Sequence, residues 1–283
     1  MTSVNEALRI ARSRFTQSST PALDAELLLA HALGRKRAWL HAWPEAQLTA
    51  PDLEAFEELV TRRAVGEPVA YLLGEREFWS LGLEVTPDVL IPRPETEGLV
   101  EAALAHLRAH AVTEPAILDV GTGSGCVALA LAHERPDARV TALDASGPAL
   151  AVARRNAERL GLLNVEFVLG EWFLPLGARR FDVIVSNPPY VPSEDPHLRA
   201  GDVRFEPVTA LDGGSDGLDA LRELAAAAPH HLVPGGLLAV EHGPDQAQPV
   251  AALFRDAGLV DIDALADAAG LARITLGRGP QAA

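Results

Sequence analysis

The chain has 283 residues, of which 48% are hydrophobic and 22% charged, and its formal net charge is −15. This length allows a sizeable core in one or two domains. The longest apolar stretches are short and interrupted by Gly, Pro or charged residues, which argues against a transmembrane helix. The acidic balance argues against a protein that clamps duplex DNA, because phosphate contacts require a basic surface. A protein partner is therefore favoured over nucleic acid.

Residues 1–74 are predicted to form a small helical domain. Ser3 and Glu6 have the spacing of a helix capping box, and Thr20 precedes a proline that suits the first turn of a second helix. Short β-prone runs follow in residues 75–92, where glycine and proline interrupt them. We expect this stretch to be a linker that can form a β-hairpin.

From residue 93 to residue 283 the expected strands and helices alternate. Such alternation predicts an α/β fold with a doubly wound, mostly parallel sheet and helices on both faces. Ligands of such sheets bind beyond the carboxyl ends of the strands, so residues that follow a strand are candidates for a site. The expected strands are residues 116–120, 138–143, 165–169, 181–186, 237–241, 259–262 and 272–276.

Three strand ends carry residues that suit a nucleotide-like ligand. The glycine-rich turn Gly121-Thr122-Gly123-Ser124-Gly125 allows close backbone approach, although its spacing differs from that of dinucleotide binders and it could be a purely structural turn. Asp144 ends the next strand and suits two ribose hydroxyls, or else caps the following helix. Glu171-Trp172 follows the third strand, where Trp172 could form a wall for an adenine or belong to the core.

The tetrapeptide Asn187-Pro188-Pro189-Tyr190 follows the fourth strand and is the most informative motif. The Asn187 side-chain carbonyl and the Pro188 backbone carbonyl can accept both N–H bonds of one planar –NH2 group, and Tyr190 offers an aromatic face for stacking. Because no strong base is present, the electrophile must already be reactive, as a sulfonium methyl group is. The motif therefore predicts methyl transfer to an amino or amide nitrogen, against the alternative of a proline-rich turn.

Cysteine and histidine usage limits the chemistry further. The single cysteine, Cys126, excludes an intramolecular disulfide, fits a reducing cytoplasm, and lies on an apolar helix as a packing residue. No Cys/His grouping has metal-ligand spacing, so no metal is expected. The N-terminus lacks the basic-then-apolar layout of a signal peptide, and a cytoplasmic location is expected.

Taken together, the turn Gly121–Gly125, Asp144 and the tetrapeptide resemble class I S-adenosylmethionine-dependent methyltransferases that act on planar amino nitrogens. This resemblance implies a Rossmann-like, seven-stranded sheet and S-adenosyl-L-methionine as cofactor, with S-adenosyl-L-homocysteine as product. The group includes DNA adenine and cytosine amino-methyltransferases and protein-glutamine methyltransferases. The tetrapeptide alone does not choose among them.

Further segments resemble the peptide chain release factor glutamine methyltransferase family, also called HemK or PrmC. They are residues 68–78, 90–97, 204–207 and 211–218. The resemblance implies methylation of the side-chain amide nitrogen (N5) of the glutamine in the Gly-Gly-Gln motif of class 1 release factors. At Leu90, where some relatives carry an aromatic residue, the substrate wall is expected to be less tightly packed.

The resemblance also assigns roles to residues and domains. Residues 1–74 become a helical substrate-binding domain, although they could merely cap the methyltransferase domain at residues 93–283. Substrate contacts fall on Asn187, Pro188, Pro189 and Tyr190, which are also the catalytic candidates, and Arg93 either joins them or is a charge at a helix start. Cofactor contacts fall on Gly121, Thr122, Gly123, Ser124, Gly125, Asp144, Glu171, Trp172 and Asn187.

Other functions remain open from the sequence. The glutamine could belong to a ribosomal protein, or the amino group could be adenine N6 of DNA, although neither a basic groove nor a target-recognition region is evident. A nucleotide-binding oxidoreductase or an inactive binding module is a different class of function. The G-x-G-x-G spacing and the intact tetrapeptide argue against both.

Overall fold

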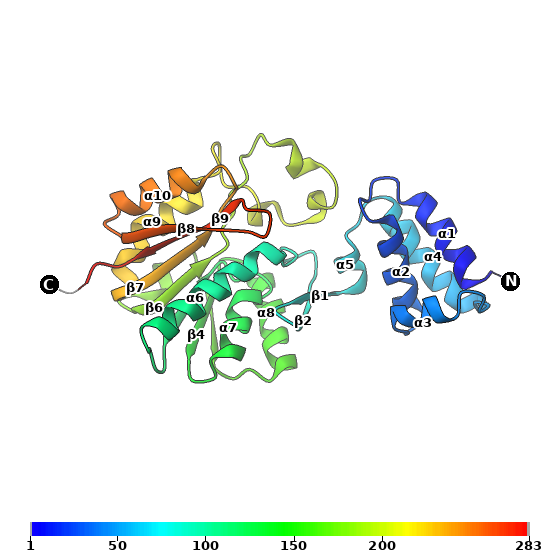
Figure 1. Cartoon of the computed structure of the whole chain (residues 1–283), viewed down its shortest axis with the longest axis horizontal. Helices are drawn as coiled ribbons and strands as arrows, with labels where there is room; N and C mark the ends of the chain where they lie inside the picture. Colours follow the sequence, from blue (N-terminus) through cyan, green and yellow to red (C-terminus); the bar gives the residue numbers. More distant parts are fainter. Residues whose placement is uncertain (1, 282–283) are drawn as a thin grey trace. The chain divides into compact units, whose positions relative to one another are not determined.

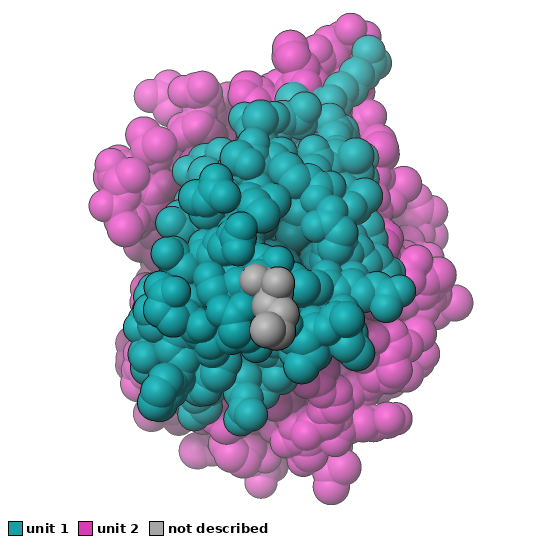
Figure 2. Space-filling model, turned by 90° about the vertical axis from the view of Figure 1, so that its right-hand side faces the viewer, with its two compact units in different colours: residues 1–75, 199–205 teal, residues 76–198, 206–283 magenta. Residues whose placement is uncertain are grey.

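The structure is a computed structural model that describes residues 2–281. It divides into two compact units, which Figure 2 shows in different colours. The N-terminal unit contains the chain up to Glu75 together with Arg199–Phe205, and the sheet unit contains Arg76–Leu198 and the chain from Glu206 onward. Arg199–Phe205 thus joins the N-terminal unit although it is far from it in the sequence.

The N-terminal unit is helical around an apolar core that includes Leu28, Leu29 and Phe56. The Ser3 hydroxyl accepts the Glu6 N–H at 3.3 Å, as the predicted capping spacing requires. The helices are α1 (Val4–Arg14), α2 (Pro21–Ala32), α3 (Arg37–Ala42), α4 (Ala50–Ala64) and α5 (Val69–Leu73).

The same unit contains an ionic cluster centred on the buried side chain of Arg63. The Arg63 side chain is only 6% exposed; its Nε donates to Asp24 Oδ2 at 2.8 Å and its Nη1 to Asp202 Oδ1 at 2.8 Å. Asp24 also accepts the hydroxyl hydrogen bonds of Ser18 and Thr20. Asp202 lies in the 199–205 segment, so this cluster ties that segment to α2 and α4 inside the N-terminal unit.

A two-stranded hairpin follows, formed by β1 (Glu75–Phe78) and β2 (Leu81–Glu84). Trp79 and Ser80, between the two strands, both have positive φ angles, of 53° and 59°. Two successive residues with positive φ are typical of the two-residue turns that connect hairpin strands, because the twist of such a turn matches the twist of the strands.

The sheet unit is built on a seven-stranded sheet with the order β5-β4-β3-β6-β7-β9-β8 (Figure 1). The neighbouring strands among β5, β4, β3, β6 and β7 pair in parallel, whereas β9 is antiparallel to both β7 and β8. The predicted seven-stranded, mostly parallel sheet is therefore confirmed. The strands are β3 (Ala116–Val120), β4 (Arg139–Asp144), β5 (Val165–Leu169), β6 (Phe181–Ser186), β7 (Leu232–Glu241), β8 (Val260–Ala266) and β9 (Ala272–Arg278).

Two apolar cores cover the two faces of this sheet. Successive strand residues alternate between them: Ile117 joins the core under α6, α7 and α8, and Leu118 joins the core under α9 and α10. This double coverage explains why the strands read as continuous apolar runs. The helices of this unit are α6 (Glu97–Ala109), α7 (Cys126–Glu134), α8 (Gly147–Leu160), α9 (Asp219–His231) and α10 (Ala247–Asp256), with short helices η1 (Pro94–Thr96), η2 (Leu174–Leu176) and η5 (Val208–Ala210). The short helix η3 (Pro196–Arg199) ends in the segment that belongs to the N-terminal unit, and η4 (Val203–Phe205) lies within that segment.

Strand order fixes where a ligand can bind. From the central β3 the chain moves outward through β4 to β5, and then returns to place β6 on the other side of β3. Val120 of β3 and Ser186 of β6 are paired in parallel register. Gly121 and Asn187 therefore leave the sheet side by side at its topological switch point, where open α/β sheets bind their ligands.

Candidate active site

The glycine turn after β3 leaves room on its outer side. Gly121, Gly123 and Gly125 have φ angles of 75°, 55° and 85°, which L side chains rarely adopt. A Cβ on Gly121 or Gly123 would meet nothing within 4 Å, so these two residues border open space. A Cβ on Gly125 would instead lie 3.1 Å from Leu129 Cδ1, so this glycine permits the close packing of α7. The turn thus offers backbone that a ligand can approach.

Asp119, the next-to-last residue of β3, holds this turn in place. Its buried Oδ2 accepts the Thr122 hydroxyl at 2.7 Å and the Ala128 N–H at 3.1 Å. Burial raises the pKa of the Asp119 carboxyl to about 7. Asp119 is not among the residues predicted for the site. The available signal is its position as the one charged residue of the apolar run 116–120.

Asp144, at the end of β4, bonds the glycine turn directly. Its Oδ2 accepts the Gly123 N–H and its Oδ1 accepts the Ser146 N–H, both at 2.8 Å. Burial raises the pKa of Asp144, while these N–H donors oppose that rise. The N-cap of α8 is Ser146, whose hydroxyl accepts the Ala149 N–H at 3.2 Å, so capping is not the function of Asp144. Asp144 keeps lone pairs for a ligand's hydroxyl groups.

The tetrapeptide after β6 is held by a buried hydrogen-bonded group. Asn187 Nδ2 donates to Thr96 Oγ1 at 3.2 Å, and the Thr96 hydroxyl donates to Glu241 Oε2 at 2.6 Å. The Tyr190 hydroxyl donates to the other carboxylate oxygen, Glu241 Oε1, at 3.1 Å. Burial raises the pKa values of both Glu241 and Tyr190. One carboxylate therefore holds Tyr190 directly and is linked to Asn187 through Thr96.

Arg93 is also fixed by a carboxylate within the sheet unit. Its guanidinium contacts Glu206 Oε1, and Glu206 Oε2 accepts the Ile91 N–H at 3.0 Å. The Glu206 side chain is fully buried, whereas that of Arg93 is 34% exposed. This pair joins the segment before α6 to the start of the segment after η4.

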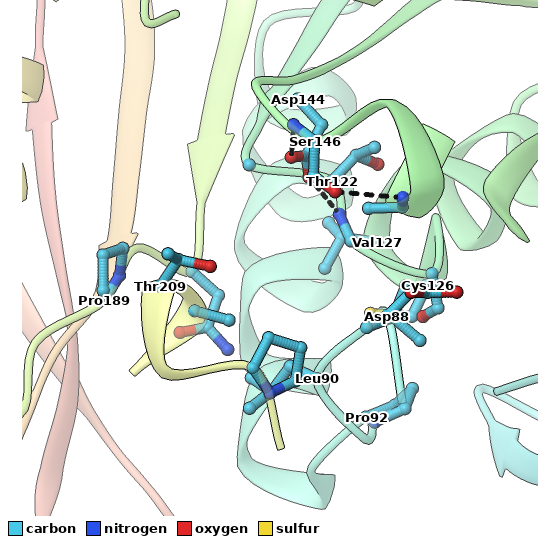
Figure 3. Close-up of a pocket in the computed structure, with 18 of the residues that line it drawn as sticks. Asp88, Leu90, Pro92, Thr122, Cys126, Val127, Asp144, Ser146, Pro189 and Thr209 are labelled. Carbon is cyan, nitrogen blue, oxygen red and sulfur yellow. Dashed lines mark hydrogen bonds between the residues drawn. The ribbon is translucent and has the colours of Figure 1, made fainter. Parts of the chain in front are cut away.

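A cavity of about 470 Å³ lies between these elements. Figure 3 shows Thr122 and Asp144 on one side of it and Pro189 and Thr209 on the other. Its lining brings together the predicted residues Arg93, Gly121, Thr122, Gly123, Ser124, Asp144, Asn187 and Pro189, with Leu90, Thr96, Asp119, Pro207 and Thr209 among the others.

Five residues predicted for the site lie outside this lining: Gly125, Glu171, Trp172, Pro188 and Tyr190. Glu171 is exposed and Trp172 is half-buried against the core under α9 and α10. Tyr190 packs against the same core while its hydroxyl bonds Glu241. For these residues, as for those that line the cavity, the assigned contacts with cofactor or substrate stay predictions.

The described residues give little support for a nucleophilic cysteine, a metal site or a membrane-spanning helix. Desolvation raises the pKa of the Cys126 thiol to about 12, so this half-buried residue, which lines the cavity, is not suited to act as a nucleophile. Among residues 2–281, no three His, Cys, Asp or Glu side chains are grouped to hold a metal ion. Over the same residues, every helix is too short or too polar to cross a bilayer.

Comparisons with known proteins give consistent results. Residues 6–74 match the family described as PrmC N-terminal domain, and residues 100–203 match the methyltransferase small domain. The release factor glutamine methyltransferase of Vibrio cholerae serotype O1 is 48% identical over 278 residues, covering 97% of this chain and 96% of the relative. That of Xylella fastidiosa (strain Temecula1) is 53% identical over 258 residues, covering 91% and 93%.

A solved structure shows the same fold. The 16S rRNA methyltransferase of T. thermophilus, in complex with AdoMet and guanosine, superimposes with a TM-score of 0.53 at 19% identity. The match covers 72% of this chain and 49% of that chain. At this identity the likeness concerns the fold alone.

Proposed function

The chain belongs to the family of release factor glutamine methyltransferases, and we propose that it methylates the side-chain amide nitrogen of a glutamine in class 1 release factors. The methyl donor is S-adenosyl-L-methionine and the target is the glutamine of the Gly-Gly-Gln motif. Relatives that are about half identical over more than nine-tenths of the chain carry this proposal. The meeting of the glycine turn and the tetrapeptide at one cavity supports it.

The residues at the cavity fit the cofactor. Gly121 and Gly123 border open space, so a ligand can contact the backbone of the turn without meeting a side chain. We assign the ribose hydroxyls to Asp144, and the adenine to the region of Glu171 and Trp172. When bound, the cofactor supplies a methyl group already activated by its sulfonium. The protein therefore needs to orient the nucleophile more than to activate it.

The orientation of the nucleophile falls to the tetrapeptide. Asn187 Oδ1 and the Pro188 carbonyl accept the two N–H bonds of the glutamine amide, and the ring of Tyr190 contacts its planar face. Both acceptors are neutral and weakly basic, so they fix the nitrogen without removing its proton. Fixing both hydrogens favours rehybridisation of the nitrogen, so that its lone pair points at the methyl carbon. The proton is lost to water after transfer.

The protein substrate needs a larger contact surface than the cavity offers. We assign part of this surface to the helices of residues 1–74, which the family comparison identifies as the PrmC N-terminal domain. Arg93, at the cavity and fixed by Glu206, is assigned to the glutamine loop. A release factor substrate also places the enzyme in the cytoplasm, where translation terminates.

Transfer of radiolabelled methyl groups tests the proposal. The purified chain is incubated with labelled S-adenosylmethionine and, separately, a class 1 release factor, the same factor with its Gly-Gly-Gln glutamine replaced by alanine, a purified ribosome, and unmethylated DNA. Label on the wild-type factor alone is the expected result. Label on the alanine variant moves the target to another residue, and label only on ribosomal protein or DNA overturns the substrate. Absence of label in every sample, with cofactor binding shown by calorimetry, contradicts the activity toward these substrates.

A further inference from the structure

Glu241 is a buried carboxylate that the proposed reaction does not use directly. It is 2% exposed and ends β7, one residue beyond Val240, which pairs with Ser186 of β6. Glu241 and Asn187 therefore leave neighbouring strands at the same level of the sheet. A buried ionised group is costly unless hydrogen bonds compensate it, so its position calls for a physical reason.

The hydrogen bonds of Glu241 show that it acts as an acceptor at both oxygens. Thr96 Oγ1 lies 2.6 Å from Oε2, the separation typical of a hydroxyl that donates to a carboxylate. The Tyr190 hydroxyl lies 3.1 Å from Oε1. In this geometry the Thr96 hydroxyl donates to Oε2 and the Tyr190 hydroxyl donates to Oε1, so each hydroxyl gives its only hydrogen to Glu241.

This commitment determines what Thr96 can offer to Asn187. With its hydrogen given to Glu241, Thr96 Oγ1 can only accept, and the amide group facing it must be the –NH2 of Asn187. The 3.2 Å bond from Asn187 Nδ2 to Thr96 Oγ1 has this direction. The two ends of an Asn amide are nearly the same size, so only hydrogen bonding can select between them. The carbonyl end, Oδ1, is left free for a ligand.

We propose that Glu241 is a positioning residue that, through Thr96, sets the orientation of the Asn187 amide so that Oδ1 is presented to the substrate. This inference rests on the proposed function, in which Oδ1 accepts an N–H of the glutamine amide. An amide turned the other way would present –NH2 to the –NH2 of the substrate, and two donors cannot bond. By also holding the Tyr190 hydroxyl, Glu241 fixes both ends of the tetrapeptide.

Three variants of the full-length enzyme test whether Glu241 orients the Asn187 amide through Thr96. We call this series of hydrogen bonds the relay. Glu241→Gln keeps the shape of the side chain, but its –NH2 can donate to Thr96, which then donates to Asn187 and reverses the amide. Thr96→Val removes the hydroxyl, and Thr96→Ser retains it. Thr275→Val is the matched control, because Thr275 is equally buried and its Oγ1 bonds His242 Nε2 at 2.8 Å without contacting the tetrapeptide.

Steady-state methylation of the release factor is measured for each variant, with S-adenosylmethionine affinity from calorimetry and folding from thermal melting. Glu241→Gln and Thr96→Val should lower kcat on the order of 100-fold, because misplaced reacting groups lose about that much. Their KM for the release factor and Kd for the cofactor should stay within about threefold of wild type. Thr96→Ser should restore most of kcat. A double variant that combines Glu241→Gln with Thr96→Val should lose no more kcat than either single variant, because both residues act through the same series of hydrogen bonds.

The outcomes separate this inference from the function on which it rests. If wild type fails to label the release factor, the proposed function fails. If wild type is active but Glu241→Gln and Thr96→Val keep kcat within about threefold, the relay is refuted, and a rise in KM with unchanged kcat refutes it equally. If Thr275→Val lowers kcat as strongly, the losses reflect general loosening of the sheet and the relay is refuted. Should Glu241→Gln not fold, the contrast between Thr96→Val and Thr96→Ser decides alone.

Discussion

Replacing Asp144 by alanine tests how this chain holds the cofactor. The carboxylate already accepts the N–H bonds of Gly123 and Ser146, both at 2.8 Å. A carboxylate has about four lone-pair sites, so two remain for ribose hydroxyls. Because Asp144 lines the cavity beside the glycine turn, those remaining sites are available to a bound ligand.

The expected loss of affinity follows from the strength of such bonds. A hydrogen bond to a charged group contributes about 1.5–3 kcal/mol. Two ribose bonds at the lower end of this range sum to about 3 kcal/mol, which corresponds to a rise in Kd on the order of 100-fold. Asp144→Ala should therefore weaken S-adenosylmethionine binding by about that factor. At saturating cofactor, kcat should fall much less, because Asp144 does not contact the reacting amide.

Calorimetry with two ligands separates the ribose contact from loosening of the turn. Wild type should bind an S-adenosylmethionine analogue that lacks both ribose hydroxyls on the order of 100-fold more weakly than the cofactor itself, because the same two bonds are lost. The Asp144→Ala variant should bind both ligands about equally. Unchanged affinity of the variant for S-adenosylmethionine, or an equal loss for both ligands, would refute the ribose assignment. Asp137→Ala is the control, since Asp137 accepts the Glu114 N–H at 3.1 Å but is not part of the cavity lining.

Three further substitutions have expected outcomes. Asn187→Ala should lower kcat on the order of 100-fold or more while cofactor Kd, measured by calorimetry, changes little, because the lost carbonyl orients only the substrate amide. Arg63→Met should lower the unfolding free energy, measured by urea denaturation, by about 3–5 kcal/mol, because it leaves the buried Asp24 carboxylate without its cation. Arg62→Met, at the exposed neighbouring residue, is the control and should cost less than about 1 kcal/mol. Burial lowers the pKa of His106 from 6.5 to about 4, so the folded state binds this proton less readily than the unfolded chain and stability falls as the pH drops from 6.5 to 4. His106→Leu should make the melting temperature fall less steeply over that range, and identical slopes would contradict the assignment.

The parts of the site predicted from the sequence are those that follow strands. An apolar run of five or six residues identifies a buried parallel strand, and the carboxyl ends of such strands meet at one edge of the sheet. Gly121, Asp144 and Asn187 were therefore predicted to lie together, and all three line one cavity. Strand boundaries were less accurate: β7 begins at Leu232, whereas the sequence suggested residue 237. Gly235 and Gly236 interrupt the apolar pattern there: Gly235 has a φ angle of 76°, and the pairing with β6 shifts register between Leu232 and Leu237.

The contacts that support the site were not predicted, because nothing local shows which distant residues meet. Thr96 and Glu241 are separated by 145 residues, and Arg93 and Glu206 by 113. The same holds for Arg63 and Asp202, which are 139 residues apart and bring Arg199–Phe205 into the N-terminal unit. A single sequence shows the polar residue at each end of such a pair without showing that the two meet.

Glu241 illustrates which additional information is needed to predict a residue that supports the site. A carboxylate that ends an apolar strand is a visible signal, and its side chain must find donors if it is buried. Its importance depends on β7 lying next to β6, since only then do Glu241 and Asn187 emerge at the same level. Strand order is set by how helices pack across the whole sheet, so it cannot be read from the residues of either strand. Predicting such a supporting residue therefore requires the topology first, and the hydrogen-bond donors and acceptors can then be matched residue by residue.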